Sequence, residues 1–117
     1  LGKWWNSRTN NFPMPLGGNV VRRDLGEQAM KDITMYTKMS IEYAIANPDE
    51  ALEFAKKWGR GIDDDTNRKF VTMYVNQRTI DYREDGRESI RQFISEGQEI
   101  GLIDKDFDVA LIDFIGS

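Results

Sequence analysis

Hydrophobic and polar positions recur with helical spacing over most of the chain after residue 24. The longest stretch lies between residues 25 and 46, where the stripe comprises Ala29, Ile33, Tyr36, Ser40 and Ala44, widened by Met30, Thr37, Ile41 and Ile45. Asp24 suits an N-cap, and Glu27 follows at the spacing of a capping box. Asn47-Pro48 should end this helix, because proline pushes the residue before it towards extended geometry.

Three shorter helices are expected after the long one. The first begins at Pro48 or Asp49 and ends at residues 59–61, where two glycines occur. The second follows Asp63-Asp64-Asp65, whose carboxylates suit the partial positive charge of a helix N-terminus. A polar turn over residues 81–86 then leads to the third, from about Arg87 to Gly101.

Two features of the last third of the chain need an explanation in the fold. Gly97 lies within the last predicted helix, where glycine costs about 1 kcal/mol relative to alanine, so it marks either a close helix contact or a tolerated weak point. Residues 107–115 are apolar and partly β-prone. We expect this tail to dock on another part of the protein, since an apolar segment left free promotes aggregation.

The first 23 residues have a different pattern. Trp4-Trp5 and Arg8 fit a short helix, and the prolines that follow predict an extended run from Phe12 to Leu16. Gly17-Gly18 then permits a bend. The segment Asn19–Arg23 contains two adjacent β-branched residues, and it is the best candidate for a strand outside the tail.

These elements predict a mainly α fold with one or two short strands, in a single unit over residues 1–117. Residues 1–23 would be an extended or strand-crossover segment, residues 24–102 the helical part and residues 103–117 a tail. A chain of 117 residues is long enough to bury a core without a disulfide or a structural metal.

Composition removes several kinds of chemistry. The chain contains neither histidine nor cysteine. It therefore has no zinc-finger, iron–sulfur or cysteine-nucleophile site, and no imidazole for metal binding or acid–base catalysis. We predict no metal and no cofactor.

The charge distribution argues against polyanionic partners. The net charge is −4, and from Glu96 onward six acidic residues are accompanied by Lys105 alone. An acidic tail disfavours a nucleic acid, and Arg22-Arg23 is too small a basic patch to reverse this. No apolar run approaches the roughly 18 residues that a membrane span requires. We therefore expect no nucleic acid and no membrane as partner.

The most site-like feature is Gly17-Gly18-Asn19, because glycine lets a ligand approach the backbone and asparagine offers donors and an acceptor. A plain bend at a strand entry explains it equally well. Asp63-Asp64-Asp65 lacks the spacing of a calcium loop, so helix capping is the preferred interpretation. Trp4-Trp5 is either an interface anchor or a docking surface in a larger fold. Tyr82 could line a pocket, although helical spacing of aromatic residues favours a core.

Several segments carry a family pattern in a fixed order. The most specific stretch follows Trp4-Trp5 and reads Pro13-Met14-Pro15-Leu16-Gly17-Gly18-Asn19-Val20-Val21-Arg22-Arg23-Asp24-Leu25-Gly26. Shorter matches follow at Ser40–Ala44, Pro48–Ala51, Met73–Asn76, Thr79–Tyr82 and Asp85–Arg87, and the likeness thins after Leu102. As a set they resemble the 1,4-dihydroxy-6-naphthoate synthase family, which acts in menaquinone biosynthesis by the futalosine pathway.

The resemblance implies a two-lobed α/β fold like that of periplasmic binding proteins. It also implies a cytoplasmic lyase that converts cyclic dehypoxanthinyl futalosine, held in a cleft between the lobes, to 1,4-dihydroxy-6-naphthoate. The family's proposed proton acceptor is a histidine upstream of the Pro-x-Pro-Leu-Gly segment. Since this chain has no histidine, we expect it to be the C-terminal part of such an enzyme, without catalytic residues, inactive alone and prone to self-association.

By the same resemblance, Gly17, Gly18 and Asn19 would lie near the substrate cleft. Arg22 and Arg23 would attract an anionic carboxylate, although a solvated strand end suits at least one of them. Three alternatives stay open: a non-enzymatic solute-binding domain of the same fold, the related chorismate dehydratase, and a free-standing helical interaction module. Gly17-Gly18-Asn19 and the Arg-Arg-Asp-Leu-Gly stretch favour the naphthoate synthase over the dehydratase.

Overall fold

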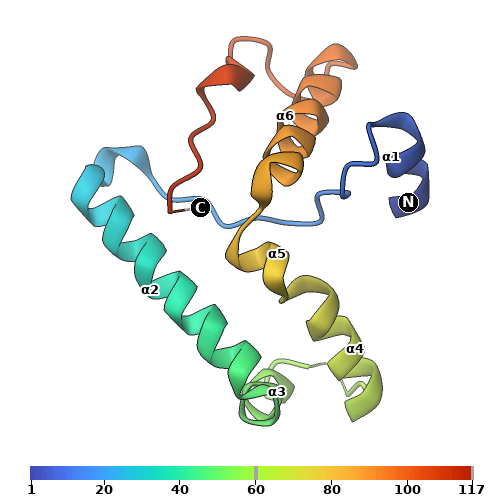
Figure 1. The fold of residues 1–117 in the computed structure, drawn as a ribbon, viewed down its shortest axis with the longest axis vertical. Coiled ribbons are helices and arrows are strands. Elements are labelled where there is room, and N and C mark those ends of the chain that lie inside the picture. Colours follow the sequence, from blue (N-terminus) through green and yellow to red (C-terminus); the bar gives the residue numbers. More distant parts are fainter. Residues whose placement is uncertain (60, 117) are drawn as a thin grey trace. The chain divides into compact units, whose positions relative to one another are not determined.

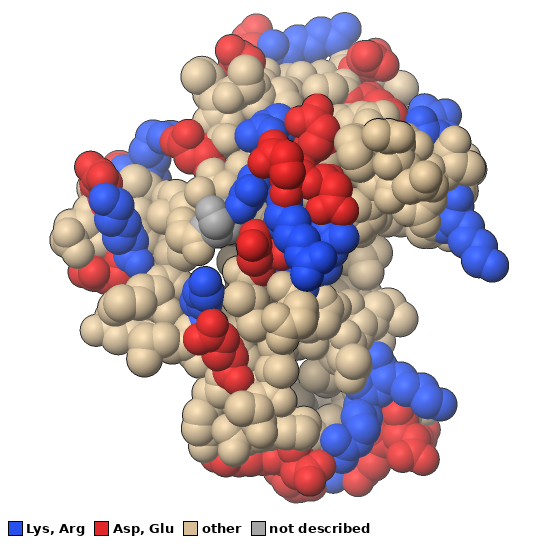
Figure 2. Space-filling view, in the orientation of Figure 1, with Lys and Arg blue, Asp and Glu red and all other residues tan. Residues whose placement is uncertain are grey.

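The computed structural model describes residues 1–59 and 61–116, which divide into two compact units. Residues 1–19 and 82–115 form the first unit, and residues 20–81 with Gly116 form the second. Every regular element in these residues is a helix (Figure 1). Acidic and basic side chains are interspersed on the face that Figure 2 shows.

The prediction of one or two short strands, and of an α/β fold, is therefore wrong for the described residues. Arg22 does have an extended backbone, with φ −68° and ψ 128°. Val20, two residues before it, is 98% exposed. β-Branched residues form a strand only where a neighbouring strand completes the backbone hydrogen bonds, and this segment instead leads into the 3₁₀ turn η1 (Arg23–Leu25).

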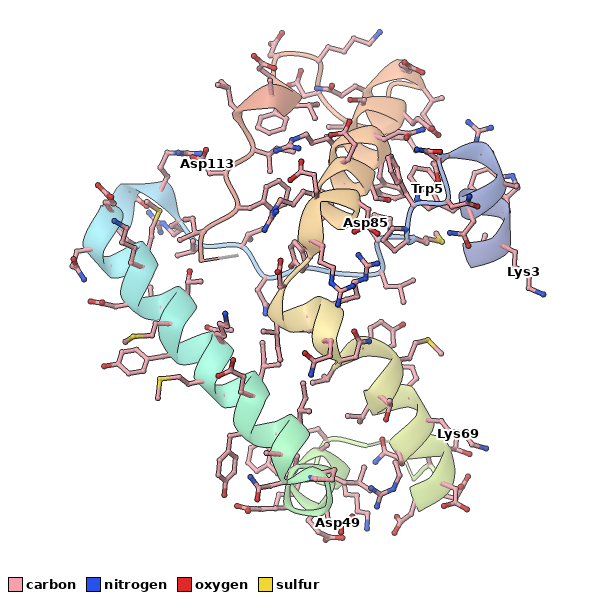
Figure 3. All side chains as sticks on the ribbon, in the orientation of Figure 1. Lys3, Trp5, Asp49, Lys69, Asp85 and Asp113 are labelled. Carbon is pink, nitrogen blue, oxygen red and sulfur yellow. The ribbon has the colours of Figure 1, made fainter. Side chains whose placement is uncertain are left out.

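The first unit is organised around a buried tryptophan. Trp5 of α1 (Gly2–Arg8) is 1% exposed, and its Nε1–H donates to Oγ of Ser89 on α6 (Arg83–Glu99) at 2.8 Å (Figure 3). Ser89 Oγ donates in turn to the carbonyl oxygen of Pro13 at 2.6 Å. The ring of Phe93 meets Trp5 edge-on, with centroids 5.6 Å apart. These contacts fasten α1 and the proline segment to one side of α6.

The C-terminal end of α6 turns back on itself. Gly101 has φ +77°, a conformation that favours glycine. The amides of Leu102 and Ile103 both donate to the carbonyl of Gly97, at 2.9 and 3.1 Å. A Cβ placed on Gly97 would lie 2.7 Å from Cδ1 of Ile103. The close approach at Gly97 is therefore made by a residue in the turn after α6 and not by another helix.

The tail docks on the N-terminal part of α6, as expected from its apolar sequence. It contains the 3₁₀ turn η2 (Val109–Leu111), in which Asp108 caps the amide of Ala110. The ring of Phe114 meets Tyr82 edge-on at 6.1 Å. The guanidinium of Arg91 lies 5.2 Å from the centroid of Phe114, within the range of a cation–π interaction.

The second unit consists of η1 and four helices: α2 (Glu27–Ala46), α3 (Pro48–Lys56), α4 (Asp64–Tyr74) and α5 (Gln77–Ile80). α2 packs against η1, α3 and α5, and α3 packs against α4. The predicted end of the long helix before Pro48 is confirmed. Pro48 occupies the first position of α3, where its missing N–H leaves no helical hydrogen bond unmade.

Two helix starts differ from the prediction, and α3 ends at Lys56 rather than at residues 59–61. Gly26, with φ +84°, is the N-cap of α2, so the capping role predicted for Asp24 is wrong. The Asp24 carboxylate instead accepts a hydrogen bond from Nε of Arg22 at 2.9 Å. The predicted polar turn over residues 81–86 is also wrong, because α6 begins at Arg83. Its acidic first turn, with Glu84 and Asp85, complements the helix dipole.

We expect Ser89→Ala to lower the free energy of unfolding by roughly 2–4 kcal/mol, because the buried indole N–H and the Pro13 carbonyl both lose a partner. Urea titration followed by far-UV circular dichroism measures the loss. Ser40→Ala is the control, since Ser40 is an exposed helical serine, and it should change stability by less than about 0.5 kcal/mol. Equal effects of the two substitutions would contradict the structural role of Ser89.

In the natural chain, Gly97→Ala should not raise the free energy of unfolding by the roughly 1 kcal/mol expected from helix propensity, since the new methyl group would clash with Ile103. In an Ile103→Ala background the obstruction is gone, and the same substitution should stabilise the chain. Thermal unfolding of the four proteins in this cycle tests the coupling. A stabilisation of similar size in both backgrounds would show that the contact with Ile103 is not the reason for a glycine at position 97.

Candidate functional site

Gly17-Gly18-Asn19 lies in the first unit, at the end of the segment that Ser89 fastens through Pro13. A Cβ on Gly18 would lie 3.3 Å from the hydroxyl oxygen of Tyr82, tighter than most packing contacts. A Cβ on Gly17 would have no heavy atom within 4 Å. The structure thus holds Gly18 against Tyr82 and leaves the backbone at Gly17 open to an approaching molecule.

The surroundings of Tyr82 combine aromatic rings with arginines. Arg87 and Arg91 lie near the ring of Phe114, which in turn meets Tyr82. Their charges are balanced within α6, because Glu84 lies 3.3 Å from Arg87 and Glu88 lies 3.3 Å from Arg91. The two arginines therefore hold Phe114 of the tail while glutamates of the same helix balance their charges.

Arg22, the fourth predicted site residue, belongs to the second unit. Its guanidinium binds the Asp24 carboxylate through Nε and Nη2. The hydrogen bonds that Arg22 donates to the Asp24 carboxylate raise the pKa of Arg22 and lower the pKa of Asp24. An incoming carboxylate would therefore compete with Asp24 for this guanidinium. Arg23 lies next to it, in η1.

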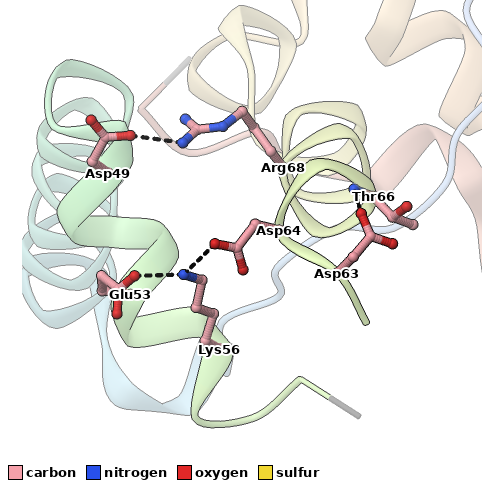
Figure 4. Close-up of polar contacts among 7 residues, drawn as sticks. All are labelled: Asp49, Glu53, Lys56, Asp63, Asp64, Thr66 and Arg68. Atoms are coloured by element: carbon pink, nitrogen blue, oxygen red, sulfur yellow. Dashed lines mark hydrogen bonds and ion pairs between the residues drawn. The ribbon is translucent and has the colours of Figure 1, made fainter. Parts of the chain in front are cut away.

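The aspartate run at residues 63–65 is confirmed as a helix cap. Oδ1 of Asp63 accepts the backbone N–H of Thr66 at 2.9 Å (Figure 4). Asp64 Oδ2 lies 2.7 Å from Nζ of Lys56, which also binds Glu53. Within residues 1–59 and 61–116, no group of three acidic side chains is placed to hold a metal ion.

Sequence reasoning missed the role of Ser89, which lies in a polar stretch and has no motif of its own. The one available signal is its spacing from Phe93, four residues later, which puts both on the same face of a helix. It also missed the close approach of the Tyr82 hydroxyl to Gly18, because the two residues are 64 positions apart in the chain. The capping box in which Asn76 and Thr79 open α5 was readable from the sequence but was not recognised.

Residues 1–99 match a protein family described as menaquinone biosynthesis, and this match covers most of the chain. The chain belongs to this family. A 1,4-dihydroxy-6-naphthoate synthase from Thermus thermophilus is 34% identical over 102 residues, which is 87% of this chain and 37% of that protein. A protein of the same name from Streptomyces coelicolor is 27% identical over 103 residues, 88% of this chain and 36% of its own length.

The chain thus spans little more than a third of these menaquinone-biosynthesis relatives. No solved structure matches it significantly. Among the helices of the described residues, none has the length and apolar character needed to cross a membrane.

Folding should lower the pKa of Asp63, because its carboxylate accepts the backbone N–H of Thr66. A carboxyl group of this kind stabilises the fold above its unfolded pKa, and the stabilisation disappears as the pH falls through its folded pKa. An NMR titration of the side-chain carboxyl carbon should give a lower midpoint in the folded chain than in urea.

Substitutions separate this cap from a metal site. Asp63→Asn should keep α4 capped while removing its share of the acid dependence, and Asp63→Ala should lose the cap. Calcium ions should leave the Asp63 titration unchanged. A calcium-dependent midpoint would contradict the capping role.

Proposed function

We propose that the chain is one part of a 1,4-dihydroxy-6-naphthoate synthase, a lyase that converts cyclic dehypoxanthinyl futalosine to 1,4-dihydroxy-6-naphthoate. The observation that carries the proposal is the family match over residues 1–99, together with two relatives that both bear this enzyme's name. The same names favour the naphthoate synthase over a dehydratase or a solute-binding domain.

The chain contributes substrate contacts rather than the reacting group. It has no histidine, and the resemblance puts the family's proton acceptor in a segment that this chain does not contain. The proposed contacts are made at Gly17, Gly18 and Asn19, through backbone amides and the asparagine side chain. The open space beside Gly17 and the fixed position of Gly18 against Tyr82 support this assignment.

Arg22 has a separate role in the proposal. Its guanidinium would attract a substrate carboxylate, exchanging the exposed Asp24 partner for the ligand. Because exposed ion pairs in water contribute little to stability, this exchange costs little. We also place the complete enzyme in the cytoplasm, since the expected substrate is a small molecule of a biosynthetic route.

A chimera tests the proposal. The 102-residue segment of the Thermus thermophilus protein that matches this chain is replaced by the chain itself. The chimera should form naphthoate from cyclic dehypoxanthinyl futalosine, while the isolated chain should form none. A chimera with the circular dichroism spectrum of the natural enzyme and no turnover would contradict the proposal, as would turnover by the isolated chain.

Within the chimera, Gly17→Ala should lower kcat/KM at least about tenfold, because the methyl group enters the space proposed for substrate. The melting temperature of the isolated chain should not change, since apart from its chain neighbours no described residue has a heavy atom within 4 Å of the new methyl group. Gly2→Ala is the matched control, as Gly2 also has nothing within 4 Å but lies in α1. Equal activity of the two variants would show that Gly17 does not lie in the proposed cleft.

A further inference from the structure

Backbone conformation does not explain why residues 17 and 18 are both glycines. The described glycines with φ in the left-handed region lie elsewhere, at positions 26, 61, 101 and 116. An alanine could therefore adopt the backbone conformation of Gly17 or Gly18 without strain. What distinguishes the two positions is the space beside each missing side chain.

The hydroxyl of Tyr82 occupies the space beside Gly18. Its oxygen lies 3.3 Å from the position of a Cβ on Gly18, and among the described residues, chain neighbours aside, no other heavy atom lies within 4 Å. The ring carbon that bears the hydroxyl is thus farther away than 4 Å. The absence of a side chain at Gly18 therefore makes room for one oxygen atom of one residue.

Tyr82 is constrained from two directions. The edge of its ring meets Phe114 of the tail, with centroids 6.1 Å apart, and Arg91 lies 5.2 Å from the centroid of Phe114. Tyr82 is also the N-cap of α6, and Arg83 directly after it has φ +57°. Such a conformation is unfavourable for a side chain other than glycine or asparagine, and it persists only where the surrounding structure imposes it. The hydroxyl of Tyr82 consequently has a defined position.

The glycine pair needs such a support if it is to bind a ligand through its backbone. Residues 16–20 are all exposed, and two consecutive glycines have more conformational freedom than any other dipeptide. Ordering them on binding would lower the affinity, whereas amides already held in the bound geometry avoid this cost. Ser89 holds the segment at Pro13, and Tyr82 meets it again at Gly18.

We propose that Tyr82 is a positioning residue for the substrate contacts of Gly17 and Asn19. Its hydroxyl fixes the backbone of Gly18 between them, and Phe114 of the tail fixes Tyr82. The proposal rests on the proposed function, because it takes Gly17-Gly18-Asn19 as the surface that meets the substrate of the naphthoate synthase. Gly17 is then left without a side chain for the ligand, and Gly18 for Tyr82.

The chimera with the Thermus thermophilus protein provides the kinetic test. Tyr82→Phe removes the hydroxyl and keeps the ring, so KM should rise roughly three- to tenfold while kcat stays within about twofold. A merely destabilised enzyme would instead lose active molecules, which lowers the apparent kcat and leaves KM unchanged. Tyr36→Phe is the control, because it makes the same change at a tyrosine of α2 that is 64% exposed.

A double-mutant cycle tests whether the hydroxyl acts through Gly18. Gly18→Ala alone should raise KM, because the methyl group displaces the Tyr82 hydroxyl. In the Tyr82→Phe background the obstructing oxygen is absent, so adding Gly18→Ala should change KM by less than about twofold. Gly17→Ala should instead lower kcat/KM by the same factor in both backgrounds, since no described residue approaches its methyl group.

NMR relaxation of the isolated chain measures the restraint without any activity. The order parameter of the Gly18 amide should be lower in Tyr82→Phe than in the natural chain, because the segment moves more freely without the hydroxyl. Tyr36→Phe should leave it unchanged. Circular dichroism verifies that both variants keep the helical content of the natural chain.

The two proposals fail in different experiments. A folded natural chimera without turnover contradicts the proposed function. An active natural chimera in which Tyr82→Phe keeps the natural KM, or in which Gly18→Ala and Tyr82→Phe have additive effects, overturns the role of Tyr82 and leaves the proposed function intact. An unchanged order parameter at Gly18 overturns that role whatever the chimera does.

Discussion

One buried indole N–H determines how α1 and the proline segment pack on α6. An indole N–H placed away from water needs an acceptor, and Ser89 supplies one to Trp5 from the middle of α6. The serine hydroxyl also has a proton to donate, which it gives to the Pro13 carbonyl. Two hydrogen bonds therefore join α6 to two neighbouring points near the N-terminus, Trp5 and Pro13. Because Pro13 lies only four residues before Gly17, the same pair of bonds fixes where the glycine pair emerges.

The helix starts of the second unit are determined by interactions within one helical turn more than by contacts between distant segments. Pro48 and Asp63 set helix starts through properties that act within one turn, namely a missing N–H and a side-chain acceptor. Helical spacing was accordingly sufficient to predict α2, α3 and α4 from the sequence. The same rules failed at Asp24, where two groups compete for one carboxylate and the guanidinium two residues away prevails over the helix amides.

Other features were beyond sequence reasoning for definable reasons. The strand expected at residues 19–23 requires a partner strand, which side-chain preferences within the segment do not supply. The candidate site at Gly17-Gly18-Asn19 was predicted from this short motif and from the family resemblance, but the difference between the two glycines was not predicted. Only the fold reveals that the Tyr82 hydroxyl lies close to Gly18 and not to Gly17, because that difference depends on a residue of another segment.

The placement of the tryptophans gives each unit a distinct optical character. Trp5 is in an apolar site with its N–H engaged, whereas Trp58, in the second unit, is 78% exposed. Unfolding transfers the Trp5 indole into water and red-shifts its emission, but it scarcely alters the surroundings of an indole that water already reaches. The intrinsic fluorescence of this chain is consequently a selective reporter of the first unit, while ellipticity records the helices of both.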